Sequence, residues 1–178
     1  VHAAMQGYID REQLAGVITL VARHGEVVYL DRCGMMDREA GKEMQCHAIF
    51  RIYPMSKPIT SLAVMMLYEE GHFRLNSSIA DFLPAFKEMK VYQPRGNADY
   101  DLVPAQRQIT IRDLLTHTAG LSYGFDEHSP VDELYRTKVW KTLDENPEAD
   151  LAMMVDEIAK LPLANQPGAG WRYSTATD

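Results

Sequence analysis

The sequence predicts a mixed α/β (α+β) chain, in which a β-hairpin near the start is followed by mainly helical segments. Residues 16–23 read Gly-Val-Ile-Thr-Leu-Val-Ala-Arg, a β-branched run typical of a strand. A turn at residues 24–26 and the apolar residues 27–30 predict the returning strand of a hairpin. Farther along, apolar residues recur every three or four positions in several segments, which is the helical period.

Two helices are expected around this hairpin. Residues 1–14 suit a short amphipathic helix, and residues 35–48 after the hairpin predict a loop. A longer helix should begin near Pro54, because proline is favoured at the first helical position, and end near Gly71. Its apolar spacing predicts one buried face made of Ile59, Leu62, Ala63, Met66 and Leu67.

The remaining segments are assigned by caps, turn residues and periodicity. A short helix over residues 79–83, a surface loop over 88–107 and a turn at 167–170 are predicted. Further helices are expected from residue 109 to about 117, near 130–140, and over 150–161. The buried side predicted for the last of these is Leu151, Met154, Val155, Ile158 and Leu161.

Length, composition and net charge exclude several classes of function. The chain has 178 residues, 46% of them hydrophobic, which is enough for one domain with a sizeable core. A net charge of −7 argues against binding to nucleic acid or to anionic membranes. Neither a long apolar run nor a signal-peptide pattern is seen, which predicts a cytoplasmic protein. Cys33 and Cys46 are interpreted as structural thiols, and no metal-ligand spacing or cofactor motif is found.

Residues 50–60 carry the most informative motif. They read Phe-Arg-Ile-Tyr-Pro-Met-Ser-Lys-Pro-Ile-Thr, with Lys57 preceded three residues earlier by Pro54. This segment resembles the Ser-x-x-Lys motif of the serine β-lactamase and penicillin-recognising superfamily. The form is that of the class C β-lactamase-like group, which includes the family VIII carboxylesterases. By this resemblance Lys57 is the catalytic lysine, and Pro54 stands where the family has its nucleophilic serine.

Two further blocks resemble the same family, in the family's order. Residues 114–121, Leu-Leu-Thr-His-Thr-Ala-Gly-Leu, resemble a supporting block near the site, in which His117 is interpreted as a structural histidine. Pro167-Gly168-x-x-Trp171-x-Tyr173-Ser174 resembles the block that carries the catalytic tyrosine, which assigns that role to Tyr173. Thr175 stands where β-lactamases have an asparagine, a departure that favours the esterases.

The resemblance implies an acyl-transfer mechanism without a cofactor. A serine hydroxyl needs a nearby base, and a lysine one helical turn away shares its face of the helix. The resemblance therefore predicts that Lys57 is buried near Tyr173. Pro54 removes both the hydroxyl and a backbone N–H. In the family that N–H is an oxyanion-hole donor, and loss of one donor costs about 10²–10³-fold in rate. Ser56 lies about 200° away around the helix and cannot substitute.

The implied fold is β-lactamase/transpeptidase-like, an antiparallel sheet flanked by helices plus a helical region. The chain is interpreted as a single partial domain, the N-terminal part of this fold, with residues 1–50 forming the helix and hairpin and residues 51–178 the mostly helical region. An incomplete sheet has an exposed edge. The expected partners are therefore a second copy of the chain or a complementary C-terminal chain, besides a small ester or β-lactam-like substrate.

Two functions remain open at this point. The first is a serine hydrolase of the carboxylesterase or β-lactamase type, impaired here by Pro54. The second is a non-catalytic relative that binds ligands or serves as a scaffold. Pro54 could reflect natural loss of function, an error in this copy, or chemistry located elsewhere.

Overall fold

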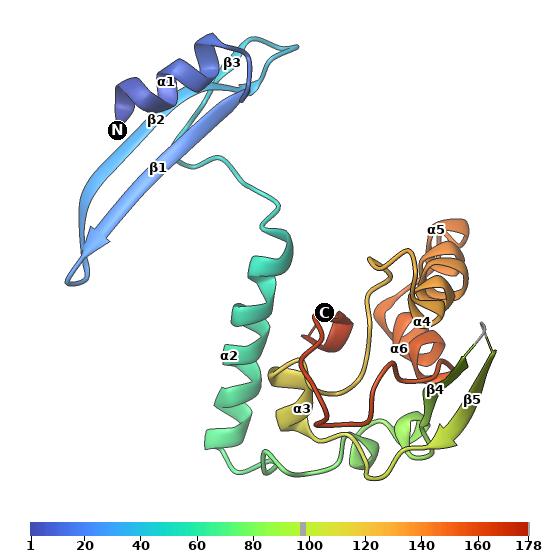
Figure 1. Ribbon diagram of the computed structural model, residues 1–178. Helices are drawn as coiled ribbons and strands as arrows, with labels where there is room; N and C mark the ends of the chain where they lie inside the picture. Colours follow the sequence, from blue (N-terminus) through green and yellow to red (C-terminus); the bar gives the residue numbers. More distant parts are fainter. Residues whose placement is uncertain (97–98, 178) are drawn as a thin grey trace. The chain divides into compact units, whose positions relative to one another are not determined.

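The structure is a computed structural model that describes residues 1–96 and 99–177. The chain forms two compact units, Val1–Ile52 and Tyr53–Asp178. We call them the N-terminal unit and the C-terminal unit and describe each by itself. Mixed helices and antiparallel strands confirm the predicted fold class (Figure 1).

The N-terminal unit is a three-stranded antiparallel sheet with one helix. Its elements are α1 (His2–Asp10), β1 (Gly16–Arg23), β2 (Glu26–Asp37) and β3 (Lys42–Glu43), with the strands in the order β1-β2-β3. The predicted hairpin is confirmed. The predicted loop over residues 35–48 was partly wrong, because β2 continues to Asp37 and pairs there with β3.

Few side chains of this unit are buried. Among its residues, all of which the structure describes, only Cys33 and Met44 are buried apolar side chains. Leu20, Val28 and Leu30 remain 50–60% exposed on the strands. Much of the apolar surface of the sheet is therefore not covered by the N-terminal unit itself.

The C-terminal unit begins with a 3₁₀ turn, Tyr53–Met55, that leads into α2 (Ser56–Glu69). The start of this helix near Pro54 and its end near Gly71, whose φ is +82°, agree with the prediction. The predicted buried face was wrong: Leu62 and Met66 are 64% and 57% exposed, and Lys57 is the buried residue. Because α2 is apolar on several sides, periodicity alone could not choose the side that packs.

A second hairpin replaces the surface loop predicted over residues 88–107. It consists of β4 (Lys90–Gly96) and β5 (Asp99–Pro104), which pair antiparallel. Its first strand also bridges Leu163, through hydrogen bonds from Leu163 N to Lys90 O and from Tyr92 N to Leu163 O. Contact with a distant segment stabilises a polar, turn-rich sequence as a strand.

Short helices complete this unit. The helices predicted near residues 109, 130 and 150 are confirmed. They are α3 (Ile111–Leu115), α4 (Pro130–Leu134), a π-helical stretch (Tyr135–Trp140), α5 (Lys141–Glu145) and α6 (Leu151–Ala159), with 3₁₀ turns at Ile79–Asp81, Pro84–Phe86 and Thr175–Thr177. On α6, Ile158 is buried as predicted, whereas Leu151 is 62% exposed.

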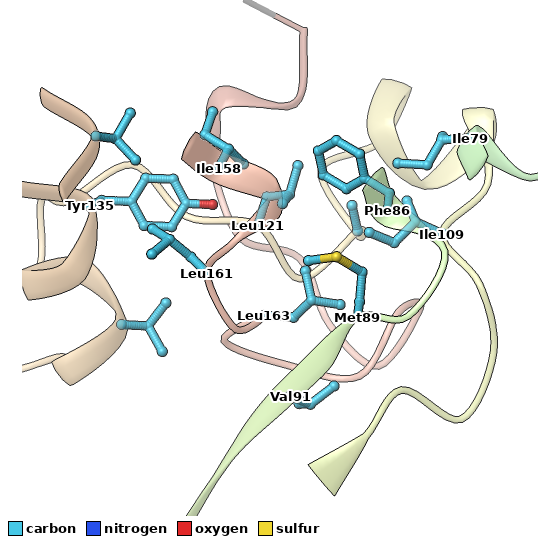
Figure 2. Packing of buried hydrophobic residues seen from close by; sticks show 13 residues of the cluster. Ile79, Phe86, Met89, Val91, Ile109, Leu121, Tyr135, Ile158, Leu161 and Leu163 are labelled. Carbon is cyan, nitrogen blue, oxygen red and sulfur yellow. The ribbon is translucent and has the colours of Figure 1, made fainter. Parts of the chain in front are cut away.

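The core of the C-terminal unit gathers side chains from segments between Ile79 and Leu163 (Figure 2). Tyr135, Val139 and Leu163 are at most 1% exposed. The other members come from the segment before β4, from β4, from the supporting block and from α6. They include Ile79, Phe86, Met89, Val91, Ile109, Leu121, Ile158 and Leu161. This core fixes the loops that carry the site.

Candidate active site

The predicted site residue Lys57 lies in the first turn of α2 and is only 6% exposed. Its Nζ lies 5.3 Å from the ring centroid of Tyr173 and 5.4 Å from that of Tyr123. An ammonium group over an aromatic face is attracted by the ring quadrupole. The structure thus brings together Lys57 and Tyr173, as expected, and adds Tyr123.

Three aromatic rings form a stack beside Lys57. The centroids of Tyr123 and Tyr173 are 5.7 Å apart with an interplanar angle of 16°. Phe125 stacks on Tyr123 at 4.5 Å and 14°. The indole N–H of Trp140 donates to Tyr123 O at 2.6 Å, which holds the loop that carries two of these rings.

Tyr173 is held by the supporting block. His117 contacts the Tyr173 ring at 5.0 Å between centroids, and its Nδ1 is 3.2 Å from Ser174 Oγ. His117 O accepts a hydrogen bond from Arg172 N at 2.8 Å. The Tyr173 hydroxyl is buried and makes no hydrogen bond within residues 1–96 and 99–177. His117 packs against the tyrosine segment, the position expected of a structural histidine.

A buried polar network lies on the other side of Tyr173. Arg172 donates from Nη2 to Asp132 Oδ1 at 2.7 Å and from Nε to Ser122 Oγ at 2.9 Å. The Ser122 hydroxyl donates to Asp132 Oδ1, and Asp126 N donates to Asp132 Oδ2 at 2.8 Å. Asp132 and Ser122 are 2% and 1% exposed. Sequence reasoning missed these residues, because no local pattern links positions 122, 132 and 172.

The network keeps Asp132 ionised. Burial alone would raise the pKa of this carboxyl, but the hydrogen bonds from Ser122, Asp126 N and Arg172 outweigh burial and lower it. Nearby, burial raises the pKa of the Tyr135 hydroxyl to about 12. That hydroxyl is 3.1 Å from Ser122 N and accepts its hydrogen bond. Tyr135 therefore stays neutral at physiological pH.

A second buried aspartate, Asp113, lies beneath the supporting block. Arg107 binds its carboxylate with two nitrogens, at 2.6 and 2.9 Å. Thr110 donates to Asp113 from its backbone N–H and its hydroxyl, and accepts from Asp113 N, so the pair forms a capping box at the start of α3. Burial raises the pKa of Asp113, and these hydrogen bonds outweigh burial and leave the pKa well below its usual range.

A cavity of about 280 Å³ opens beside Tyr173. Phe125 and Trp171 line it and are 70% and 69% exposed. Tyr123, Asp126 and Arg172 complete much of its wall. Exposed aromatic side chains next to a few polar groups are typical of sites that bind small organic molecules.

Comparison with known proteins decides the family. The sequence profile described as Beta-lactamase matches residues 1–178. The chain belongs to the β-lactamase family. One relative of this chain is the esterase EstB of Burkholderia gladioli, which is 36% identical over 96% of this chain and 40% of EstB. A lovastatin esterase from Penicillium rubens is 28% identical over 97% of this chain and 43% of its own length.

Solved structures of two other proteins share the fold of this chain. EstCE1, a hydrolase with promiscuous acyltransferase activity, superposes with a TM-score of 0.78 at 32% identity, over 98% of this chain and 42% of its own. The octameric penicillin-binding-protein homologue from Pyrococcus abyssi superposes with a TM-score of 0.65, over 99% of this chain and 35% of the homologue's own length. The chain therefore spans about two fifths of the length of these relatives.

Two kinds of feature are absent from the described part of the chain. No group of three or more histidine, cysteine or acidic side chains there could hold a metal ion. No described helix is long and apolar enough to cross a membrane.

Proposed function

We propose that this β-lactamase-family chain carries the lysine–tyrosine half of an acyl-transfer site for carboxylic esters, and that Pro54 prevents formation of an acyl-enzyme. The observation that carries the proposal is the buried Lys57 amino group beside the stacked rings of Tyr123 and Tyr173. Esterases among the relatives support ester substrates over β-lactams.

The position of Pro54 supports the proposed impairment. Residues 53–55 form the turn that continues into α2, so position 54 precedes Lys57 by about one helical turn. A serine hydroxyl there would lie about one turn before Lys57, and the neutral amine form of Lys57, directly or through Tyr173, could take its proton as the hydroxyl attacks an acyl carbon. Proline supplies neither that hydroxyl nor a backbone N–H. Ser56 is exposed at the start of α2 and does not replace it.

Labelling with a fluorophosphonate tests this proposal. A serine hydroxyl that attacks the phosphorus forms a P–O bond, releases fluoride and gives its proton to the base. Intact-mass spectrometry of the parent chain should show no adduct, whereas Pro54→Ser should gain one phosphonyl group. Adding Lys57→Ala to Pro54→Ser should abolish labelling, and Pro54→Ala should stay unlabelled. An adduct on the parent chain, or none on Pro54→Ser, contradicts the proposal.

A second candidate function is ligand binding without turnover, which the cavity beside Tyr173 favours. A ketone that mimics an ester but cannot be cleaved, 4-phenyl-2-butanone, is a suitable probe. Binding should quench the fluorescence of Trp171, which lines the cavity, and Trp171→Phe should remove the quenching. Saturable quenching that persists in Trp171→Phe would place the ligand elsewhere.

The partner we propose is a complementary C-terminal chain. The outward apolar side chains of α2, such as Ile59 at 61% exposure and Leu62 at 64%, support a covering surface. The longer relatives supply such a segment within one chain. Light scattering should show that the chain alone is a monomer. In a pull-down experiment, this monomer should bind the matching C-terminal fragment of EstB. A stable homodimer that does not bind this fragment would favour a second copy instead.

A further inference from the structure

The C-terminal unit has two buried aspartates that each bind an arginine, and their ligands differ in origin. Asp113 takes its hydrogen bonds from residues close in sequence, mainly Arg107 and Thr110, as part of a helix cap. Asp132 takes its hydrogen bonds from Ser122, Asp126 and Arg172, the last of them 40 residues away. Only the second carboxylate ties separate segments of the site together.

The segments that Asp132 joins carry the two rings around Lys57. Ser122 directly precedes Tyr123, and Arg172 directly precedes Tyr173. Arg172 itself bridges Ser122 Oγ and Asp132 Oδ1 with two different nitrogens. A second link between the same segments is the hydrogen bond from Thr175 N to Ser122 O at 3.2 Å. The Asp132 carboxylate and this backbone hydrogen bond therefore hold the two segments together.

The burial of this network makes it rigid. Asp132 and Ser122 are almost fully buried, and the Arg172 side chain is 27% exposed. Charge-assisted hydrogen bonds from a guanidinium fix geometry more tightly than neutral ones. Neither oxygen of Asp132 is left without a donor. A change at this carboxylate should therefore move its partners, because no other group can replace it.

We infer that Asp132 is a positioning residue, which acts through Ser122 and Arg172 to set the rings of Tyr123 and Tyr173 around the Lys57 ammonium. This inference rests on the proposed function, which makes Lys57 and Tyr173 the acyl-transfer pair. Asp132 itself touches neither of them in any contact described above. Asp132 instead affects the distance of 5.7 Å between the two ring centroids and the position of the Lys57 Nζ beside them.

Nuclear magnetic resonance can test the positioning directly. Protons beside an aromatic face are shifted upfield, so in ¹³C-lysine-labelled protein the ε-methylene signal of Lys57, assigned with Lys57→Arg, should lie upfield of the other lysines. Asp132→Asn should lose most of this shift. The matched control Asp113→Asn, which breaks the other buried pair, should keep it. An unchanged Lys57 signal in Asp132→Asn would overturn the inference.

A milder variant covers the case in which Asp132→Asn does not fold. Arg172→Lys keeps the positive charge, but a single ammonium lacks the planar fork that spans Ser122 and Asp132. Its Lys57 signal should move toward that of the other lysines. Retention of the parent shift in folded Arg172→Lys would contradict the inference.

The catalytic consequence is tested in the Pro54→Ser background. Misplacement of about 1 Å can cost about 10²-fold in rate, so adding Asp132→Asn should slow fluorophosphonate labelling about 10–100-fold. Adding Asp113→Asn, which lacks a direct link to Tyr123 or Arg172, should slow labelling much less than adding Asp132→Asn. If Pro54→Ser is not labelled, the proposed function fails, while the Lys57 signal still decides the positioning. If it is labelled and Asp132→Asn does not slow it, the positioning inference fails alone.

Discussion

The two units of the molecule differ in how they bury apolar side chains. The C-terminal unit packs residues such as Val139 and Leu163 at 0% exposure in a shared core. The strands of the N-terminal unit also carry apolar side chains, yet Leu30 and Val28 are 50% and 60% exposed. The difference shows that an alternating or periodic apolar pattern specifies an element, while burial depends on what covers it.

The free energy of unfolding should follow the same division. In the C-terminal unit, a truncated side chain leaves a cavity among close-packed neighbours. In the N-terminal unit, the same truncation removes a side chain that is already half in water. The four predictions below test this contrast, from the largest expected effect to the smallest.

The largest effect is expected from Leu163→Ala. Leu163 is fully buried, and its backbone also joins β4. Truncation of a buried leucine costs about 2–5 kcal/mol of unfolding free energy. Urea denaturation followed by circular dichroism measures it. A loss comparable to that of an exposed leucine would show that the core is not packed as described.

A smaller effect with a pH dependence is expected from Asp113→Asn. Loss of the buried pair should cost about 1–3 kcal/mol, because Arg107 remains partly exposed to water. The folded pKa of Asp113 lies well below its ordinary value of 3.8, so the stabilisation is fully present above that value, begins to decrease near it, and is lost as the pH falls toward the folded pKa. Urea melts from pH 7 to 3 should show the parent and the variant converging in acid. A constant difference would contradict this assignment.

Tyr53→Gly should stabilise the chain slightly. Tyr53, the first residue of the C-terminal unit, is 73% exposed and has a φ of +46°, which is unfavourable for a residue with a Cβ. Relief of about 1–2 kcal/mol of backbone strain is partly offset by the entropy of glycine, leaving a gain of roughly 0.5–1 kcal/mol. Thermal melts measure the gain. The control Tyr53→Ala retains the Cβ and should show none.

The smallest effect is expected from Leu30→Ala in the N-terminal unit. Substitutions at exposed positions usually change stability by about 0.5 kcal/mol or less. The same urea melts used for Leu163→Ala provide the comparison. A loss as large as that of Leu163→Ala would mean that Leu30 is covered in solution, by a second copy or by another segment.

Some elements could be predicted from the sequence because their signals are local. The hairpin follows from β-branched residues and a turn, and the start of α2 follows from proline at the first turn. The strands β4 and β5 could not be predicted in this way, since β4 also pairs with Leu163, which is distant in sequence. Periodicity predicted the wrong buried face of α2 because that helix is apolar on several sides, whereas the family resemblance correctly predicted that Lys57 is buried.

The candidate site divides in the same way. Lys57 and Tyr173 could be found because they lie in sequence blocks with a family resemblance. Asp132 could not, because its function depends on Ser122 and Arg172 being brought together from positions 10 and 40 residues away. A carboxylate in the first turn of a short helix is common, and only the fold gives this one its partners.

The stack of Phe125, Tyr123 and Tyr173 gives the protein an optical marker of its own. Their planes lie within 16° of one another, and rings held parallel at such distances couple electronically. Near-ultraviolet circular dichroism should therefore contain a band that reports whether this part of the chain is assembled. Assembly around Lys57 can then be followed in real time during refolding, with no label and no substrate.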